Sequence, residues 1–338
     1  MKLLVTGGCG FIGSHFVRAA LEADEDLSIV NLDKLTYAGR KENLADVEKK
    51  FGEGAKGSSR QPGEGAKGKP RYSFVHGDIL DAPLVSRLCK ETDHVVHFAA
   101  ESHVDRSILE AGSFAQTDVL GTQRLLQAAL DAGHQRFFFI STDEVYGSRQ
   151  TGFFRETDKL DPSSPYSASK AGAELMVNAY ERTHGLRAVI SRTTNNYGTH
   201  QHPEKLIPRS ITGLLRGQKI KIYGTGAQER DWVHVSDNVR ALLMLLNKGK
   251  TGTYNIGTGV TTPNLEIAKG ICAALGKDFS SSIEHVADRK GHDWRYAVDW
   301  SKMKELGWKP QVGLSGGLNE TVDWYVKNKA WWQGHTVD

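Results

Sequence analysis

Residues Thr6-Gly7-Gly8-Cys9-Gly10-Phe11-Ile12-Gly13 lie between an apolar segment, residues 2–6, and a stretch with helical spacing, residues 11–23. Gly7, Gly10 and Gly13 recur at every third position of this junction. Glycine there permits a tight turn, close approach to a pyrophosphate and close packing of a helix on a strand. The free N–H groups and the positive dipole end of the helix suit phosphates. The stretch predicts a dinucleotide-binding strand–turn–helix unit.

Asp33 follows the second apolar segment, residues 28–32. An acidic side chain at this position can accept hydrogen bonds from both hydroxyls of an adenosine ribose and repels a 2′-phosphate. Asp33 therefore favours NAD over NADP, with a turn or helix-cap aspartate as the alternative. Asp78, after the third apolar segment, is placed either to contact adenosine or to form a turn.

Apolar segments alternate with stretches of helical spacing over the first part of the chain. The further segments expected as strands are 72–76, 94–98, 136–141 and 187–193, and the expected helices are 82–90, 113–132 and 166–183. Alternation of this kind predicts an α/β fold with a Rossmann-like, doubly wound parallel sheet. We expect residues 1–194 to form this domain, with 233–258 returning to it. Residues 195–338 are expected to form a smaller mixed α/β lobe.

Residues 52–69 interrupt the pattern, because Gly52-Glu53-Gly54-Ala55-Lys56-Gly57 recurs eleven positions later as Gly63-Glu64-Gly65-Ala66-Lys67-Gly68. Glycine at this density buries too little apolar surface to offset its ordering entropy. We expect a surface loop, with a functional lid as the alternative.

Composition excludes several function classes. A net charge of +3 in 338 residues is too small to indicate nucleic-acid binding. No apolar run reaches the ~18 residues of a membrane span. Cys9, Cys89 and Cys272 form no metal-binding or disulfide pattern, which predicts a reducing cytoplasm and no metal site.

Two acid/base systems lie within one short stretch. Tyr166 and Lys170 are four residues apart, so they share one face of the expected helix. The lysine charge lowers the pKa of a tyrosine beside it, so that the phenolate can take a proton from an alcohol as hydride leaves. Asp143 and Glu144 follow the expected strand 136–141 and point to a second proton-transfer step.

The chain resembles the extended short-chain dehydrogenases/reductases, and more closely their nucleotide-sugar 4,6-dehydratases that act on dTDP-glucose. Besides the glycine-rich turn and Tyr166-x-x-x-Lys170, the motifs that carry the resemblance are Asp33-Lys34-Leu35-Thr36-Tyr37-Ala38-Gly39, the run from His97 to Ser107, Ser141-Thr142-Asp143-Glu144-Val145-Tyr146-Gly147, Asn195-Asn196-Tyr197-Gly198, Pro203-Glu204-Lys205-Leu206-Ile207-Pro208, Arg230-Asp231-Trp232 and Gly291-His292-Asp293-Trp294-Arg295-Tyr296. They span residues 3 to about 325, with only the 52–69 insertion outside.

The resemblance implies a three-step reaction. Tyr166, tuned by Lys170, would take the proton of the C4 hydroxyl during oxidation, and Thr142 would hydrogen-bond that oxygen. Glu144 would remove the C5 proton while Asp143 protonates the departing C6 hydroxyl. In the third step the hydride would return from NADH to C6, which regenerates NAD and leaves a 4-keto-6-deoxy sugar.

The resemblance also implies two sets of binding residues. The expected NAD contacts are Gly7, Gly10, Phe11, Ile12, Gly13, Asp33, Lys34, Thr36, Asp78, Ile79, Ala99, Ala100, Thr117, Tyr166, Lys170 and Asn195. The expected contacts to a dTDP-sugar are Ser102, Thr142, Asn196, Lys205, Leu206, Arg230, Arg289, His292 and Tyr296. Arg230 and Arg289 would hold the diphosphate, for which a planar guanidinium is suited.

Several positions depart from the family pattern. Thr199-His200-Gln201 replaces the more usual proline and aromatic residue, Asp118 replaces the usual asparagine, and Lys290 replaces the usual proline. These differences leave open whether the nucleotide of the substrate is dTDP or UDP and which hexose it carries. The chain could alternatively be a 4-epimerase, a decarboxylase or a catalytically idle NAD-binding protein. The family also implies a homodimer in which residues 113–131 and 166–183 form a four-helix interface.

Overall fold

The computed structural model describes residues 1–53, 69–288 and 293–334. The chain divides into two compact units. The first comprises Met1–Ile140, Ser169–Ile190 and Leu245–Gly252, and the second comprises Ser141–Ala168, Ser191–Met244 and Thr253–Asp338. Residues 141–168 thus group with the second unit. Most of the 52–69 insertion lies outside the described residues.

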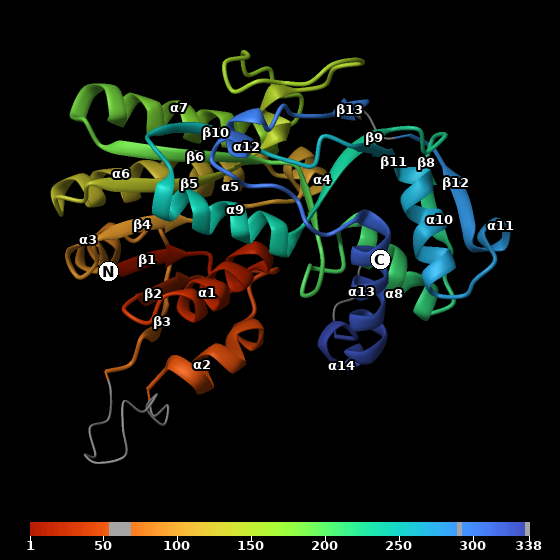
Figure 1. The fold of residues 1–338 in the computed structure, drawn as a ribbon, viewed down its shortest axis with the longest axis horizontal. Helices are drawn as coiled ribbons and strands as arrows, with labels where there is room; N and C mark the ends of the chain where they lie inside the picture. The colour runs from red at the N-terminus through yellow and green to blue at the C-terminus, as the bar shows by residue number, and fades with distance from the viewer. Residues whose placement is uncertain (54–68, 289–292, 335–338) are drawn as a thin grey trace. The chain divides into compact units, whose positions relative to one another are not determined.

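A seven-stranded sheet has the order β10-β6-β5-β4-β1-β2-β3, as Figure 1 shows. Its strands are β1 Lys2–Thr6, β2 Ser28–Asp33, β3 Tyr72–His76, β4 His94–His97, β5 Arg136–Thr142, β6 Arg187–Thr193 and β10 Gly252–Ile256. The pairings from β3 through β2, β1 and β4 to β5 are all parallel. This is the Rossmann order, in which ligands bind beyond the carboxyl ends of the strands. The predicted fold class and six predicted strands are confirmed.

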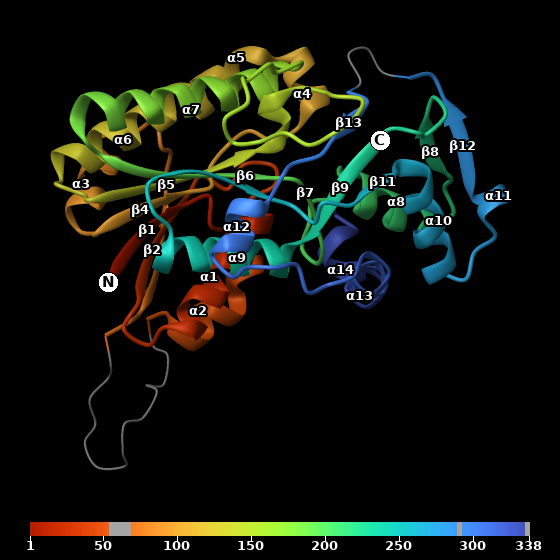
Figure 2. The same ribbon diagram turned by 45° about the horizontal axis from the view of Figure 1, so that its top comes forward.

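Helices of the first unit cover both faces of the sheet (Figure 2). They are α1 Phe11–Ala23, η1 Lys41–Leu44, α2 Ala45–Phe51, α3 Ala82–Lys90, α4 Val104–Leu109, α5 Ala111–Phe114, α6 Gly121–Asp131 and α7 Pro165–His184, of which α7 begins in the second unit. α6 and α7 lie on one face and α1 on the other. The short helices α2 and α4 were not predicted.

The expected helix 113–132 contains a π-helical segment, η2 Ala115–Leu120, between α5 and α6. A π-helical turn widens the helix by one residue and is frequent at functional sites. It changes which side chains of this helix point inward. Asp118, within it, is buried.

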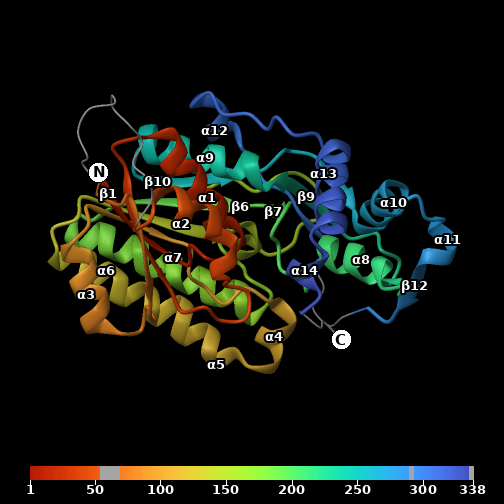
Figure 3. The same cartoon turned by 90° about the horizontal axis from the view of Figure 1, so that it is seen from below.

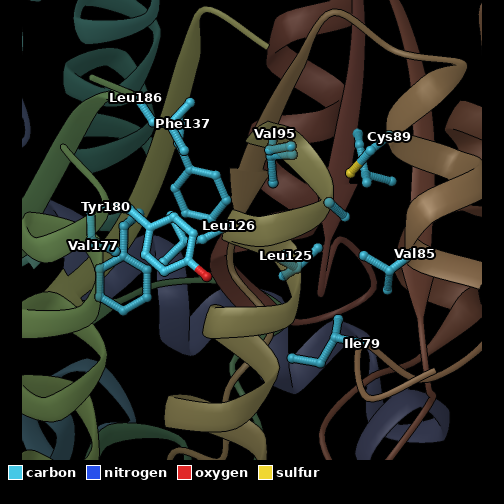
Figure 4. Close-up of a cluster of buried hydrophobic side chains, with 14 of the residues drawn as sticks. Ile79, Val85, Cys89, Val95, Leu125, Leu126, Phe137, Val177, Tyr180 and Leu186 are labelled. Carbon is cyan, nitrogen blue, oxygen red and sulfur yellow. The ribbon is translucent and has the colours of Figure 1, made fainter. Parts of the chain in front are cut away.

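The core of the first unit packs apolar sheet residues against α3, α6 and α7 (Figure 4). Phe137 of β5 lies with Leu126 of α6 and Tyr180 of α7 in this cluster. Burying each large apolar side chain contributes about 1.5–3 kcal/mol. This core fixes the strand ends from which the candidate site residues extend.

The second unit has smaller sheets and its own core. Strands β7 Asn195–Tyr197, β11 Thr261–Pro263 and β13 Arg295–Tyr296 each pair with β9 Glu229–His234, and β8 Ile220–Tyr223 pairs with β12 Ile283–Val286. Its helices are η3 Asp143–Tyr146, α8 Leu206–Leu215, α9 Val235–Lys248, α10 Asn264–Ala274, α11 Phe279–Ser282, α12 Ser301–Glu305, α13 Leu314–Lys327 and α14 Lys329–Trp332, of which α9 ends in the first unit. Figure 3 shows α8, α10 and α13 close to one another, and buried apolar residues of all three form this core. No described helix is long and apolar enough to span a bilayer.

Candidate active site

The glycine-rich turn leaves no space for a side chain at Gly7 or Gly13. Gly7 has a φ of 73°, which favours glycine. A Cβ at Gly7 would lie 2.5 Å from the Ala99 nitrogen, and one at Gly13 would lie 2.3 Å from the Gly7 oxygen. Gly10, immediately before α1, donates its N–H to the Gly7 oxygen at 3.1 Å. This cradle at a helix N-terminus fits the pyrophosphate of a dinucleotide.

Asp33 joins the glycine-rich turn to the loop after β2. Its Oδ2 accepts the N–H of Cys9 and its Oδ1 accepts the N–H of Leu35, each at 2.8 Å. Burial raises the pKa of Asp33, and the two hydrogen bonds oppose that rise. A carboxylate oxygen can accept more than one hydrogen bond. The fixed Asp33 carboxylate therefore suits a pair of ribose hydroxyls.

Asp78 follows β3 and is both a turn residue and an ion-pair partner. Its Oδ1 accepts the Leu80 N–H at 2.9 Å, and its Oδ2 lies 2.7 Å from Nζ of Lys34. Burial works to raise the pKa of Asp78, but the bond from Lys34 and the turn hold it below its ordinary value. Lys34 and Thr36 are exposed, whereas Ile79 packs into the core. Ala99, Ala100 and Thr117 are half-buried.

Lys170 is a buried cation on α7, with 3% of its surface exposed. Its Nζ donates to the Ile140 carbonyl oxygen at 2.7 Å and lies 4.2 Å from the centre of the Phe139 ring. Burial lowers the pKa of Lys170, and the charges of Asp118 and Glu174 oppose that effect. The ammonium is therefore held at the end of β5.

Tyr166 lies in the first turn of α7, and local sequence explains why the helix begins there. Ser167 donates its N–H to Oγ of Ser164 at 3.1 Å, and Ser164 donates its N–H to Oγ of Ser167 at 3.0 Å. These two reciprocal bonds flank Pro165, the first residue of the helix, and proline is favoured at that position. Tyr166 is half-buried and lies in the first turn of the helix, where the helix dipole favours negative charge.

Thr142, Asp143 and Glu144 occupy the turn where β5 ends. Oγ1 of Thr142 accepts the Glu144 N–H at 3.3 Å and donates to Oδ1 of Asp143 at 3.4 Å. Asp143 is 2% exposed, and its Oδ2 has no hydrogen-bond partner among the described residues. Burial, followed by the neighbouring Glu144 and Asp231, raises the pKa of Asp143 well above its ordinary value. Asp143 can therefore carry a proton while the half-buried Glu144 lies next to it.

Buried polar side chains anchor this turn within the second unit. Tyr146 donates its hydroxyl proton to Oδ1 of Asn255 at 2.8 Å and accepts Nη1 of Arg192 at 2.7 Å. Its ring stacks on Phe154 with 4.9 Å between centroids. Asp231 similarly accepts N–H groups of the loop after β10. Tyr146 and Asp231 lie in motifs that carry the family resemblance but do not indicate these contacts, and no motif includes Arg192 or Asn255.

Arg230 and Tyr296 lie near the two carboxyl groups. Arg230 is 4% exposed, donates through Nη1 and Nη2 to the Trp294 and Asp293 carbonyl oxygens, and lies 4.2 Å from the Tyr296 ring centre. The Tyr296 hydroxyl donates to the Asp293 carboxylate. Burial, and next the Glu144 charge, raises the pKa of Tyr296. At least part of the Arg230 guanidinium group is therefore hydrogen-bonded to backbone carbonyl oxygens.

The remaining candidates lie on separate segments. Asn196 donates Nδ2 to Oγ1 of Thr193 and to the Thr194 oxygen, both at 2.9 Å, while its Oδ1 has no partner among the described residues. Lys205 immediately precedes α8, which Leu206 begins. Ser102, in the first unit, shares a 3.2 Å hydrogen bond with Tyr37. Arg289 and His292 lie outside the described residues.

No group of three or more metal-ligating side chains is assembled among the described residues.

Comparison with known proteins identifies the family. The model of the GDP-mannose 4,6 dehydratase family matches residues 4–321. The chain is 49% identical over 327 residues to the low-salt glycan biosynthesis protein Agl12 of Haloferax volcanii, covering 96% of this chain and 99% of the relative. It is 46% identical over 339 residues to the dTDP-glucose 4,6-dehydratase of an Actinoplanes species, covering 98% and 100%.

A solved structure supports the same family assignment. It is that of DesIV, a dTDP-glucose 4,6-dehydratase from Streptomyces venezuelae crystallised with NAD bound. The TM-score is 0.90 at 49% identity, over 99% of both chains. This chain therefore belongs to the nucleotide-sugar 4,6-dehydratase family of extended short-chain dehydrogenases/reductases.

Proposed function

We propose that this enzyme is an NAD-dependent hydro-lyase that dehydrates dTDP-glucose to its 4-keto-6-deoxy derivative, a step of deoxysugar biosynthesis. The observation that carries the proposal is the pair of carboxyl groups at the end of β5. Elimination of water across C5 and C6 requires an acid and a base at once. Asp143, with its raised pKa, can supply the proton, and Glu144 can remove one.

The first step requires a base at the C4 hydroxyl. Tyr166 takes that proton, and Lys170, one helical turn later on α7, supplies the positive charge that favours its phenolate. Thr142 hydrogen-bonds the C4 oxygen. Bound NAD would accept the hydride from C4 and supply it to C6 of the 5,6-alkene that elimination leaves, while Glu144 returns its proton to C5.

The second step uses the ketone made by the first. A carbonyl at C4 acidifies the C5 proton, which Glu144 removes. Asp143 protonates the C6 hydroxyl as it leaves as water. Because Asp143 and Glu144 adjoin along the chain, the negative charge of Glu144 helps to keep Asp143 protonated before the step. The burial of Asp143 is the larger cause of its raised pKa and also keeps it protonated.

NAD is assigned to the first domain, residues 1–194, and the nucleotide sugar to the lobe of residues 195–338. The glycine cradle, Asp33 and Lys170 support the NAD assignment, together with the NAD bound in DesIV. For the diphosphate we propose Arg230 and Arg289. The other proposed sugar-nucleotide contacts are Ser102, Asn196, Lys205, Leu206, His292 and Tyr296.

We also propose a homodimer in the cytoplasm. Leu175 of α7 is 62% exposed and Leu120 of η2 is 42% exposed, while Leu109 at the end of α4 is 88% exposed. Large exposed apolar side chains are typical of a protein interface when they gather on one surface. Residues 113–131 and 166–183 would supply it. Three cysteines without a disulfide agree with a reducing compartment.

A substrate panel tests the proposed function. The enzyme is incubated with NAD and, separately, with dTDP-glucose, UDP-glucose, dTDP-galactose and UDP-glucuronic acid, and the mass of each product is measured by mass spectrometry. Loss of one water from dTDP-glucose alone supports the dTDP-glucose assignment. Loss of water from UDP-glucose instead reassigns the nucleotide. An unchanged mass with a changed sugar identifies an epimerase, and loss of carbon dioxide from the corresponding uronic acid identifies a decarboxylase.

A further inference from the structure

The loop of residues 148–163 runs from the turn that carries the two carboxyl groups toward α7, and the segment 293–296 is hydrogen-bonded to both ends of this loop. At the first end, Oγ of Ser148 accepts the N–H of Trp294 at 2.9 Å and the N–H of Arg295 at 3.2 Å. Figure 1 shows β13, the second half of the segment, beside the loop. Both stretches belong to the second unit. The connection therefore lies within one compact unit.

The other end of the loop is held by one carboxylate oxygen. Ser163 donates its hydroxyl to Oδ2 of Asp293, and Tyr296 donates its hydroxyl to the same oxygen. A carboxylate oxygen can accept two hydrogen bonds, and such bonds are roughly twice as strong as those between neutral groups. Because Ser163 is exposed, its position depends on this bond more than on packing. The bond lies three residues before Tyr166.

The same segment holds the guanidinium group that is proposed for the diphosphate. Nη2 of Arg230 donates to the Asp293 carbonyl oxygen at 2.9 Å, and Nη1 donates to the Trp294 carbonyl oxygen at 3.2 Å. The Arg230 guanidinium lies 4.2 Å from the centre of the Tyr296 ring. Arg230 and Tyr296 are both buried, with 4% and 5% of their surfaces exposed. The position of Arg230 is therefore coupled to the segment 293–296.

We propose that Asp293 is a positioning residue for the dehydratase reaction, which fixes the distance between the diphosphate held by Arg230 and the base Tyr166. The inference rests on the proposed function, because Arg230 and Tyr166 have these roles there. The sugar is attached to the diphosphate, so the position of Arg230 determines where the C4 hydroxyl lies. The start of α7 determines where Tyr166 lies. A misplacement of about 1 Å can lower a rate by roughly 10²-fold, so a direct link between the two positions affects catalysis.

Two substitutions of Asp293 test the link. Asp293→Ala removes the acceptor of both bonds, whereas Asp293→Asn keeps an oxygen that can accept them. With dTDP-glucose we expect the alanine variant to lose about tenfold or more in kcat. The asparagine variant should stay within about threefold of wild type, because a neutral acceptor is only modestly weaker. NAD affinity, measured by calorimetry, should be unchanged in both, since no NAD contact is assigned to the segment 293–296.

Ser163→Ala removes only one of the two bonds and leaves Tyr296 bonded to Asp293. It should lower kcat by a smaller factor, with KM for dTDP-glucose changed by less than about twofold, because the diphosphate side of the link is intact. The double variant, Ser163→Ala with Asp293→Ala, should be no slower than Asp293→Ala alone, since both changes break the same bond. Ser163 is exposed, so its variant also repeats the test if Asp293→Ala does not fold.

Asp278→Ala is the matched control. Oδ1 of Asp278 also accepts bonds from two serines, the N–H of Ser281 at 2.9 Å and the hydroxyl of Ser280 at 2.8 Å, at the start of α11. Asp278 belongs to the second unit but lies outside both the loop 148–163 and the segment 293–296. This variant should lower the midpoint of denaturant unfolding and leave kcat unchanged.

A second readout requires no sugar. Hydrogen exchange of the backbone amides between residues 164 and 168 should be faster in Asp293→Ala and Ser163→Ala than in wild type and Asp278→Ala. Faster exchange supports the link even if dTDP-glucose proves to be the wrong substrate. A kcat of Asp293→Ala equal to that of wild type, on any nucleotide sugar that wild type converts, overturns the proposal. Equal exchange in all four proteins overturns it as well.

Discussion

The hydroxyl group of Tyr146 donates a 2.8 Å hydrogen bond to Oδ1 of Asn255, a residue 109 positions later in the chain. The bond fixes the turn that carries Asp143 and Glu144, because Tyr146 is the last residue of η3. Arg192 donates to the same hydroxyl oxygen at 2.7 Å. The position of the two carboxyl groups therefore depends on a buried network rather than on the turn alone.

Tyr146→Phe should lower both stability and kcat. The variant keeps the stack on Phe154 but removes the buried hydrogen bonds of the hydroxyl to Asn255 and from Arg192, which costs about 1–3 kcal/mol of unfolding free energy. Denaturant unfolding measures that loss. Tyr72→Phe is the control, since it removes another buried hydroxyl, on β3, that accepts from Asn31. It should lower stability and leave kcat unchanged, whereas an equal kcat for both variants would contradict the role of the network.

Glu144→Gln should separate oxidation from elimination. Glutamine cannot remove the C5 proton, while Tyr166 and Lys170 remain to oxidise C4. Reduced nicotinamide should therefore accumulate on the protein after mixing with dTDP-glucose, seen by its absorbance, with dehydration slowed by about 10²-fold or more. Normal formation of the dehydrated product would remove Glu144 from the role of C5 base.

Asp143→Asn should change the pH dependence of stability. The pKa of Asp143 is raised in the folded protein, so folding favours the protonated acid. Its stabilising contribution is complete below the unfolded pKa of about 3.9 and is lost as pH rises through the folded pKa. The variant should therefore gain stability relative to wild type as pH increases over that window. Parallel stability curves across the window, measured in denaturant, would show that Asp143 is not held as the acid.

Leu175→Glu should disrupt the proposed homodimer. Leu175 is 62% exposed on α7, and a charge there would be buried at the interface. Light scattering after size exclusion should report a dimer for wild type and a monomer for the variant. Val260→Glu is the control because Val260 is 65% exposed in the second unit, outside the proposed interface. A monomeric wild-type protein refutes the dimer.

The sequence was most informative where structure follows from local pattern. The six strands predicted in the first part of the chain match the observed strands to within one residue at each end. Buried parallel strands are short, continuous apolar runs, and the glycine turn fixes the first crossover. The expected helix 166–183 likewise corresponds to α7, because its serine cap and Pro165 act locally.

Features that depend on tertiary contacts could not be predicted. The π-helical turn at 115–120 follows no periodic signal, so the inward position of Asp118 was not foreseen. The bond from Tyr146 to Asn255 joins residues far apart in the sequence, so no local pattern predicts it. The roles of Asp143 and Glu144 came from family resemblance and the chemistry of elimination. The raised pKa of Asp143 required its burial to be known.

The central claim is that one bound NAD carries hydride from C4 to C6 while water is lost between them. The most direct test is incubation with dTDP-glucose deuterated at C4, followed by mass spectrometry and NMR of the product. The account predicts loss of one water with the deuterium retained at C6. Retention of the full mass, or loss of water with deuterium absent from C6, would contradict it.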